Sequence, residues 1–281
     1  MIGSPTRNRE ARGLIALRRQ SALRRARAVI VRRPAVRAYK RLLDRRLEKN
    51  FELNFLPRSG LLSEYRAEVE DSGLIEHLEE QADNFRRSVR GVSEGGEPYK
   101  VGRVGRRAGL HLYAIARTLE PRIVVETGVC NGFSTAFLLL AIEQNGAGEL
   151  ISIDLPEVAG KRYAPETFWA GKGPEVIPEG KEPGWVIPDR LKSNWTLIIG
   201  RSQEELPRLL RRIGTIDSFF HDSEHSYECM WFEFTHAYAA LRGGGVLISD
   251  DVNKNSAFFD FAREVERKPV RMSWGTALLV K

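Results

Sequence analysis

Cysteine is scarce in this chain, which holds two among its 281 residues. Cys130 and Cys229 are far apart in the sequence, so they offer neither a disulfide framework nor the paired spacing of a zinc site. No run of 18 apolar residues occurs, and the first residues lack an uninterrupted apolar signal core. These absences argue against a disulfide-stabilised secreted domain and against a membrane-spanning helix. We expect a globular protein in the reducing cytoplasm.

Acidic residues are nearly absent from the first 46 positions. There, 15 Arg or Lys face only Glu10 and Asp44, giving +13, whereas the remaining 29 basic and 35 acidic residues give −6. The net charge of +7 therefore resides in this basic arm, residues 1–46. Arginines alternate with apolar residues in it, which is typical of an amphipathic helix at an anionic membrane surface. A solvated arm is an equal alternative, and nucleic acid is disfavoured because no aromatic platform accompanies the arginines.

The first hundred residues read as helical. Pro34 is expected to interrupt an N-terminal helix, and residues 35–50 and 62–90 carry helical patterns that end at the glycine-rich break Gly91–Gly96. The chain is accordingly divided into a basic, amphipathic or partly disordered segment 1–50, a helical preface 51–103 and an α/β domain 104–281.

Strand and helix patterns alternate from about residue 104 onward. The expected strands are Ile123–Glu126, Glu149–Asp154, Trp195–Gly200, Ile216–Asp222 and Val246–Asp251. The expected helices lie around 105–119, 133–144, 203–212, 227–241 and 256–267. This alternation predicts a doubly wound, mainly parallel α/β sheet covered on both faces. Val270–Trp274 and Thr276–Lys281 are too close for a parallel crossover, so we expect them to form an antiparallel hairpin at the C-terminus.

Residues 155–193 interrupt this alternation. They contain six prolines and several glycines, too many for a long regular helix. A long loop beside a ligand site is commonly functional, so we interpret this insertion as a substrate lid rather than as an irregular surface loop. Its candidate aromatic residues are Tyr163, Phe168, Trp169 and Trp185.

A dinucleotide-binding G-x-G-x-x-G fingerprint is also missing, because Gly128 and Gly132 stand four positions apart. Instead, the strand Ile123–Glu126 leads into a glycine loop, and Phe133 and Ser134 open an apolar helix. Together with Gly200-Arg201-Ser202-Gln203-Glu204, this pattern resembles class I S-adenosylmethionine-dependent methyltransferases, in particular the E-x-G-x-x-x-G-[YF]-S and G-x-S-Q-[DE] motifs of the catechol O-methyltransferase-like group. The resemblance covers roughly residues 104–281 and implies a Rossmann-like methyltransferase sheet closed by an antiparallel C-terminal strand.

The resemblance also implies a set of cofactor-binding residues at three strand ends. We expect S-adenosylmethionine to lie with its methionine part at the glycine loop, its ribose at the acid that ends the second strand and its adenine at the Ser-Gln pair. An ordinary βα turn, or an N-cap at Ser202, is the alternative for each motif taken alone. The expected residues are Glu126, Gly128, Gly132, Ser134, Asp154, Ser202 and Gln203.

Acidic residues gather at two further strand ends. Asp222 follows one strand, and Asp250 and Asp251 follow the next, so the three carboxylates can converge at one edge of the sheet. Such a group would repel unless a cation joined it, and oxygen ligands suit Mg²⁺. The trio resembles the metal site of catechol-type and of macrolide-sugar methyltransferases. Catechol-type enzymes have a lysine where this chain has His225, and the Asp-x-x-His arrangement is closer to the sugar-modifying relatives. We expect Asp222 and His225 to be catalytic, with His225 as the general base; a helix-capping or solvated His225 is the alternative.

These motifs together predict a divalent-metal-assisted, S-adenosylmethionine-dependent O-methyltransferase. Its acceptor would be a hydroxyl of a small molecule such as a sugar, a glycoside or a polyketide. Two alternatives stay open: a metal-free methyltransferase acting on RNA or protein, and a non-catalytic, membrane-associated binding module. An oligomer is compatible with the sequence, and the basic arm would place the protein at the inner membrane face.

Overall fold

The computed structural model describes residues 34–93, 96–162 and 173–281. The chain divides into two compact units, Met1–Arg46 and Leu47–Lys281. Most of the basic arm, and the lid candidates Tyr163, Phe168 and Trp169, lie outside the described residues. Within the described residues, every helix is too short or too polar to cross a membrane.

The helical preface begins with α2 (Pro34–Asn54), which spans the boundary between the two units, and continues with α3 (Leu61–Asp71) and α4 (Leu74–Ser88). The helical pattern over 62–90 is confirmed, but it is divided into two helices. Gly73 lies at φ +70° in the left-handed region, which glycine enters without steric cost, and it separates α3 from α4.

Seven strands form one mixed sheet in the order β3-β2-β1-β4-β5-β7-β6. They are β1 (Ile123–Thr127), β2 (Glu149–Asp154), β3 (Trp195–Ile199), β4 (Ile216–His221), β5 (Leu241–Ser249), β6 (Val270–Arg271) and β7 (Ala277–Val280). Strands β1 to β5 run parallel, and β7 runs antiparallel to β5 and to β6. The doubly wound plan and the C-terminal hairpin are thus confirmed. The strand order reverses between β1 and β4, so their carboxyl ends form the switch point at which such folds bind ligands.

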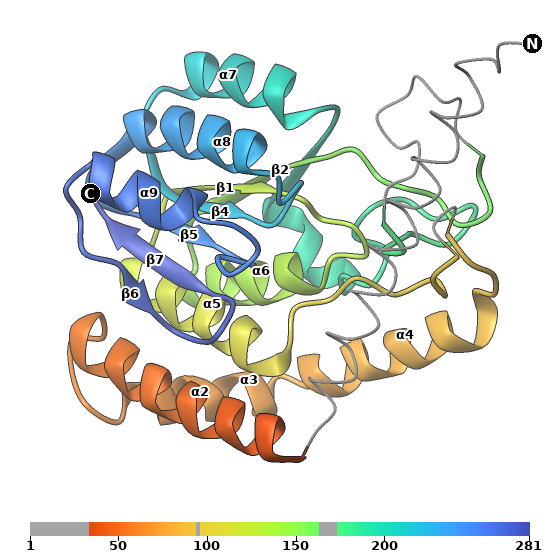
Figure 1. Cartoon of the computed structure of the whole chain (residues 1–281), viewed down its shortest axis with the longest axis horizontal. Coiled ribbons are helices and arrows are strands. Elements are labelled where there is room, and N and C mark those ends of the chain that lie inside the picture. Colours follow the sequence, from red (N-terminus) through yellow and green to blue (C-terminus); the bar gives the residue numbers. More distant parts are fainter. Residues whose placement is uncertain (1–33, 94–95, 163–172) are drawn as a thin grey trace, which may run out of the picture. The chain divides into compact units, whose positions relative to one another are not determined.

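Helices cover both faces of this sheet (Figure 1). One face packs against α5 (Arg106–Leu119), α6 (Phe133–Asn145) and the short 3₁₀ helix η1 (Asp189–Asn194), and the other against α7 (Ser202–Ile213), α8 (Tyr227–Ala240) and α9 (Ala257–Glu264). Side chains alternate between the two cores along each strand, as Val124 and Val125 of β1 do. Both are essentially inaccessible to solvent, which explains why the strands read as continuous apolar runs.

The strand β5 begins earlier than expected. We expected a strand from Val246, but β5 already starts at Leu241 and contains Gly243–Gly245. Its register with β4 shifts between Ile216 and Ser218, and a Cβ on Gly245 would lie 2.9 Å from the carbonyl oxygen of Asp217. Glycine at this position therefore permits an irregular, close approach of the two strands.

Two isolated bridges hold the described parts of the insertion 155–193, one within the insertion and one to the preface. Val158 pairs with Ile177, and Glu175 pairs with Lys100 of the preface, each as an isolated parallel bridge. The indole of Trp185 donates a hydrogen bond to Oδ1 of Asn131 in the glycine loop. Trp185 therefore anchors the insertion to the sheet and does not face the cavity described below.

Candidate active site

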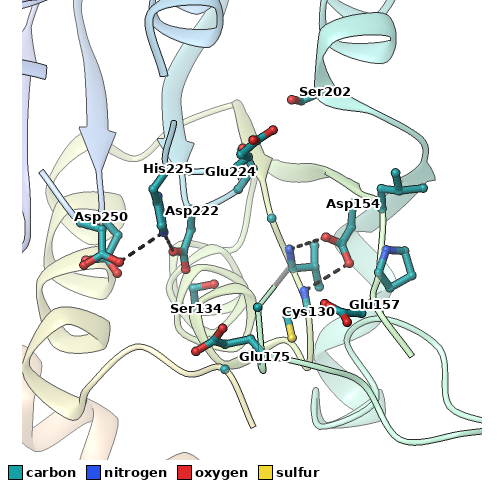
Figure 2. Close-up of a pocket in the computed structure, with 18 of the residues that line it drawn as sticks. Cys130, Ser134, Asp154, Glu157, Glu175, Ser202, Asp222, Glu224, His225 and Asp250 are labelled. Carbon is teal, nitrogen blue, oxygen red and sulfur yellow. Dashed lines mark hydrogen bonds and ion pairs between the residues drawn. The ribbon is translucent and has the colours of Figure 1, made fainter. Parts of the chain in front are cut away.

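A cavity of about 610 Å³ opens at the carboxyl ends of the strands, within the size range of small-molecule sites. The glycine loop forms its floor, and the segments Lys100–Val104 and Leu155–Glu157 line it, together with Gly173 and Glu175. Figure 2 shows polar side chains from the ends of β1, β2, β4 and β5 around this space. The cavity contains these candidate residues: Gly128, Ser134, Asp154, Ser202, Gln203, Asp222, His225, Asp250 and Asp251.

The glycine loop follows β1 and brings two halves of the cavity into contact. Gly128 lies at φ +87°, and a Cβ there would stand 2.2 Å from the carbonyl oxygen of Asp222. Gly132 lies at φ +98° and packs against Gly184 and Ile187 of the insertion, outside the cavity lining. Both glycines are thus required by protein packing. Gly128 in addition allows the glycine loop to lie directly against the backbone of Asp222.

Glu126 lies beneath the loop and not in the cavity lining, contrary to the expectation that it contacts the cofactor. Its side chain is fully buried and accepts hydrogen bonds from Ser134 (2.9 Å), Thr135 (2.9 Å) and Ser152 (2.7 Å). Burial raises its pKa to about 7 despite these three hydroxyl donors. Glu126 therefore supports the loop and the start of α6 from below.

Asp154 ends β2 and faces the cavity while holding the glycine loop. Its two carboxylate oxygens accept hydrogen bonds from the backbone N–H groups of Val129 and Cys130, each at 3.2 Å (Figure 2). Burial raises its pKa to about 6, and the backbone donors oppose that rise. Because a carboxylate has about four acceptor positions, Asp154 keeps capacity for a ligand hydroxyl.

Ser202 and Gln203 open α7 at the end of β3 and line the same cavity. The Gln203 amide donates to Sγ of Cys229 at 3.2 Å, and the Ser202 hydroxyl lies 3.9 Å from the same sulfur. These contacts join the N-terminus of α7 to α8, the helix that follows the loop carrying Asp222 and His225.

The three carboxylates of the reaction site converge as expected from the sheet register. His221 pairs with Ser249, and the backbone N–H of Asp250 donates to the carbonyl of His221, so Asp222 and Asp250 follow adjacent strand ends. Asp251 has φ +50°, a left-handed conformation that Asp tolerates better than most residues. The β6–β7 turn closes this side, because Val252 donates its N–H to the Gly275 carbonyl.

Ionisation of these carboxyl groups is disfavoured, because the protein offsets their negative charge only in part. Burial and then the neighbouring Asp250 hold the pKa of Asp222 well above its usual range. Burial and Asp251 likewise raise the pKa of Asp250 to about 6. Lys254 lies 3.1 Å from Asp251, but more than half of the lysine is exposed, so its ion pair is worth little.

His225 lies between the acids on the loop that leads into α8 (Figure 2). Its Nε2 is 3.7 Å from Oδ1 of Asp222 and 3.4 Å from Oδ2 of Asp251. Burial lowers its pKa to about 4, with the nearby His221 as the next cause. The imidazole is therefore neutral at physiological pH and able to accept a proton. The cap of α8 is supplied by Ser226, whose hydroxyl accepts the Cys229 N–H at 3.2 Å, and not by His225.

The chemistry of these carboxylates suits a divalent cation, but their present spacing does not form a ready metal-binding group. Oxygen donors with raised pKa values and incomplete neutralisation are the kind of set that Mg²⁺ binds. Across residues 34–93, 96–162 and 173–281, however, no three His, Cys, Asp or Glu side chains are arranged as a ready metal-binding group.

Several supporting residues were not anticipated from the sequence. Thr135 and Ser152 hold Glu126, and Glu233 is fully buried in α8, where it accepts a hydrogen bond from Thr127 at 2.5 Å. His221 is a further one: its Nε2 lies 3.3 Å from Nδ1 of His225. A lone acid within the apolar run of α8 was the available signal for Glu233.

One family model and several solved structures match this chain. Residues 125–252 match the family described as methyltransferase domain. The solved structure of the O-methyltransferase NovP superposes with a TM-score of 0.51 at 15% identity, covering 66% of this chain and 85% of NovP. A methyltransferase from Geobacter sulfurreducens gives a TM-score of 0.49 at 15% identity, covering 74% of this chain and 89% of that one. The calicheamicin methyltransferase CalS11 gives 0.46 at 18%, covering 62% and 77%. No curated protein matches the chain in sequence.

The mixed sheet with its order β3-β2-β1-β4-β5-β7-β6 is the Rossmann-like fold that NovP also has. The chain contains a methyltransferase domain over residues 125–252 and is an S-adenosylmethionine-dependent methyltransferase.

Proposed function

We propose that the protein is an O-methyltransferase that transfers a methyl group to a hydroxyl of a small molecule with the help of a divalent cation. The observation that carries the proposal is the contact between the glycine loop and the acid cluster. Gly128 packs on the backbone of Asp222, and the same cavity therefore holds a cofactor loop, three carboxylates and a neutral imidazole.

The cofactor would lie over the glycine loop. Asp154 would accept hydrogen bonds from the ribose hydroxyls, for which its carboxylate keeps acceptor capacity, and Ser202 and Gln203 would border the adenine. Ser134 would meet the methionine end, its hydroxyl already oriented by Glu126. The loop would thus bind S-adenosylmethionine with little rearrangement.

Asp222, Asp250 and Asp251 would hold Mg²⁺. When bound, the ion would offset the charge of the carboxylates and increase the acidity of a hydroxyl beside it. These side chains come from adjacent strand ends and a turn, so small rotations can bring their oxygens together.

His225 would act as the general base at Nε2. The acceptor oxygen would form a bond to the methyl carbon as the carbon–sulfur bond breaks, and the hydroxyl proton would pass to Nε2. The products are a methyl ether and S-adenosylhomocysteine. The protein contributes chiefly by holding the acceptor oxygen in line with the methyl group.

The acceptor class follows from the Asp-x-x-His arrangement with paired acids, which resembles the sugar-modifying relatives more than the catechol-type enzymes. We therefore propose a sugar, a glycoside or a polyketide as the acceptor.

The test is transfer of isotopically labelled methyl from S-adenosylmethionine to pools of hydroxylated small molecules, RNA and protein, each with Mg²⁺ and with chelator. Cation-dependent labelling of a small molecule, released as a volatile product by ether cleavage, is expected. Labelling of RNA or protein in chelator would favour the metal-free alternative, and cofactor binding without labelling of any pool would favour a binding module.

We also propose that residues 1–46 attach the enzyme to anionic lipid, because they carry a charge of +13. Each basic side chain near such a surface contributes about 1 kcal/mol. The full chain should sediment with vesicles containing phosphatidylserine, and a chain that begins at Leu47 should not. Equal sedimentation of the two would contradict this role.

A further inference from the structure

One polar side chain of the glycine loop has no part in the proposed cofactor and cation contacts. Asn131, which precedes Gly132, is fully buried and lies outside the cavity lining. Two other stretches of chain do line the cavity beside this loop: Lys100–Val104, here called the strap, and the part of the insertion that contains Gly173 and Glu175. Asn131 lies at the point where these stretches meet the glycine loop.

The side-chain amide of Asn131 is hydrogen-bonded to both stretches. Its Nδ2 donates to the carbonyl oxygens of Val101 in the strap and of Val176 in the insertion, the second at 2.9 Å. Its Oδ1 accepts the indole N–H of Trp185. Because a carbonyl only accepts and an indole N–H only donates, the partners fix which end of the amide is the nitrogen. Both hydrogens of the amide thus have a carbonyl partner.

The strap and the insertion are also bound to each other. The backbone N–H of Lys100 donates to the Pro174 carbonyl at 2.8 Å. Gly102 lies at φ +51°, and a Cβ there would stand 3.1 Å from both Sγ of Cys130 and Cβ of Glu175. The two stretches therefore form one continuous wall of the cavity, and the amide of Asn131 attaches this wall to the glycine loop.

A second attachment of the insertion does not depend on the Asn131 side chain. The backbone N–H groups of Gly184 and Val186 donate to the carbonyl oxygens of Cys130 (3.0 Å) and Asn131 (3.2 Å). The ring of His77 on α4 lies 2.9 Å from the Val186 carbonyl oxygen. Loss of the amide would therefore release the wall beside the cavity and leave residues 184–186 in place.

We propose that Asn131 is a positioning residue for the cofactor, whose amide holds the strap and the insertion in place as a preformed wall beside S-adenosylmethionine. The inference rests on the proposed placement of the cofactor over the glycine loop, and it assigns binding strength to a residue that does not touch the ligand. A wall that is already ordered need not be ordered when the ligand arrives, so the ligand binds more tightly. Asn131 should thus affect how tightly the cofactor is held and not the methyl-transfer step.

A residue that only supports the fold makes a different prediction. Its loss would lower the unfolding temperature and speed hydrogen exchange across the sheet, but the molecules that stay folded would bind the cofactor as before. A positioning residue changes exchange locally, in the wall, and lowers the affinity of the folded protein.

The first test uses Asn131→Leu in the full chain, a change that keeps the approximate shape of the side chain and removes its hydrogen bonds. Without ligand, exchange should become faster at the backbone amides of Lys100 and Val176, which are hydrogen-bonded between strap and insertion, and stay unchanged in β1 and β4. Calorimetric titration with S-adenosylhomocysteine should show an affinity lower by about tenfold or more.

Kinetics separate binding from chemistry in the same variant. With an acceptor found in the labelling assay, KM for S-adenosylmethionine should rise by the factor that calorimetry gives, while kcat at saturating cofactor stays nearly unchanged. Asn145→Leu is the matched control, because the Asn145 amide donates to the Ala116 carbonyl at 3.0 Å between α6 and α5, outside the cavity lining. It should lose stability and keep its affinity for S-adenosylhomocysteine.

Unchanged affinity in Asn131→Leu, or an equal loss in Asn145→Leu, would overturn the proposal. If Asn131→Leu does not fold, Gly102→Ala decides, because it displaces the strap from its other side and should also lower the affinity. Its control is Gly60→Ala, where φ is +83° and the space is open. Retained affinity in Gly102→Ala would then contradict the proposal. If no acceptor is ever methylated, the proposed function fails, but the titrations and the exchange measurements still decide this inference.

Discussion

The acidic side chains on the two sides of the cavity differ in how far the protein satisfies their hydrogen bonds and neutralises their charge. On the cofactor side, at the ends of β1 and β2, Glu126 accepts three hydroxyl hydrogen bonds and Asp154 accepts two from the backbone. On the reaction side, at the ends of β4 and β5, Asp222, Asp250 and Asp251 face one another, His225 and an exposed Lys254. The first side is satisfied by the protein itself, whereas the second accumulates negative charge that a ligand can relieve. We therefore expect that substitutions on one side impair cofactor binding and that substitutions on the other impair methyl transfer.

The largest effect is expected for Asp222→Ala. The change removes a proposed cation ligand and the carboxylate on which its neighbours converge, so methyl transfer and its dependence on Mg²⁺ should both be lost. S-adenosylhomocysteine should still bind in calorimetry, since the donors of the other side are untouched. Glu228→Ala, exposed on α8, serves as the control. Retained activity in Asp222→Ala would contradict the proposed role of the carboxylates at the ends of β4 and β5.

His225→Ala should lower turnover by about 10²- to 10⁴-fold, the usual contribution of a positioned general base. Cofactor and cation affinity should stay close to those of the unaltered chain, because neither set of proposed ligands includes the imidazole. Steady-state kinetics on the true acceptor, combined with calorimetry, checks this. An unimpaired variant would remove His225 from the mechanism.

Gly128→Val should affect both sides of the cavity, because Gly128 lies in the glycine loop and contacts the backbone of Asp222. Its Cβ would overlap the Asp222 backbone, and the left-handed φ is strained for a β-branched residue, so the unfolding free energy should fall by at least about 2 kcal/mol. Cofactor binding and activity should be lost together. Thermal unfolding and calorimetry measure both effects, and Gly146→Ala, where the space is open although φ is also positive, is the matched control. Unchanged stability would mean that the loop does not lie against β4.

Glu126→Gln should have the smallest effect on binding. Because the pKa of Glu126 is raised to about 7, its contribution to stability is fully present below its ordinary pKa of 4.5 and is lost as pH rises through 7. This loss is on the order of 3 kcal/mol at most. The Gln variant should show a weaker fall in unfolding free energy between these pH values. Its affinity for S-adenosylhomocysteine should change by less than about tenfold. A greater loss of affinity would restore Glu126 as a direct ligand.

The sequence predicted most elements of this domain because β1, β2, β4 and β5 contain apolar runs that end at a polar residue. Asp154, Asp222 and Asp250 follow such runs, and their convergence follows from a parallel sheet alone. The internal hydrogen bonds could not be predicted in this way. Glu126 was expected to be a cofactor ligand because it precedes the glycines. Its carboxylate is instead hydrogen-bonded to Ser152 from another strand. The pairing of His221 with Glu233 could not be predicted, because Glu233 lies 12 residues away, on a helix whose rotation the sequence does not specify.

The most direct measurement is a calorimetric titration of the full chain with S-adenosylhomocysteine, first in chelator and then in Mg²⁺, followed by titration of the complex with Mg²⁺ alone. The account predicts cofactor binding of similar affinity in both conditions and a separate cation-binding signal that disappears in Asp222→Ala. Cofactor binding that requires the cation, or the absence of any cation signal with or without cofactor, would contradict it.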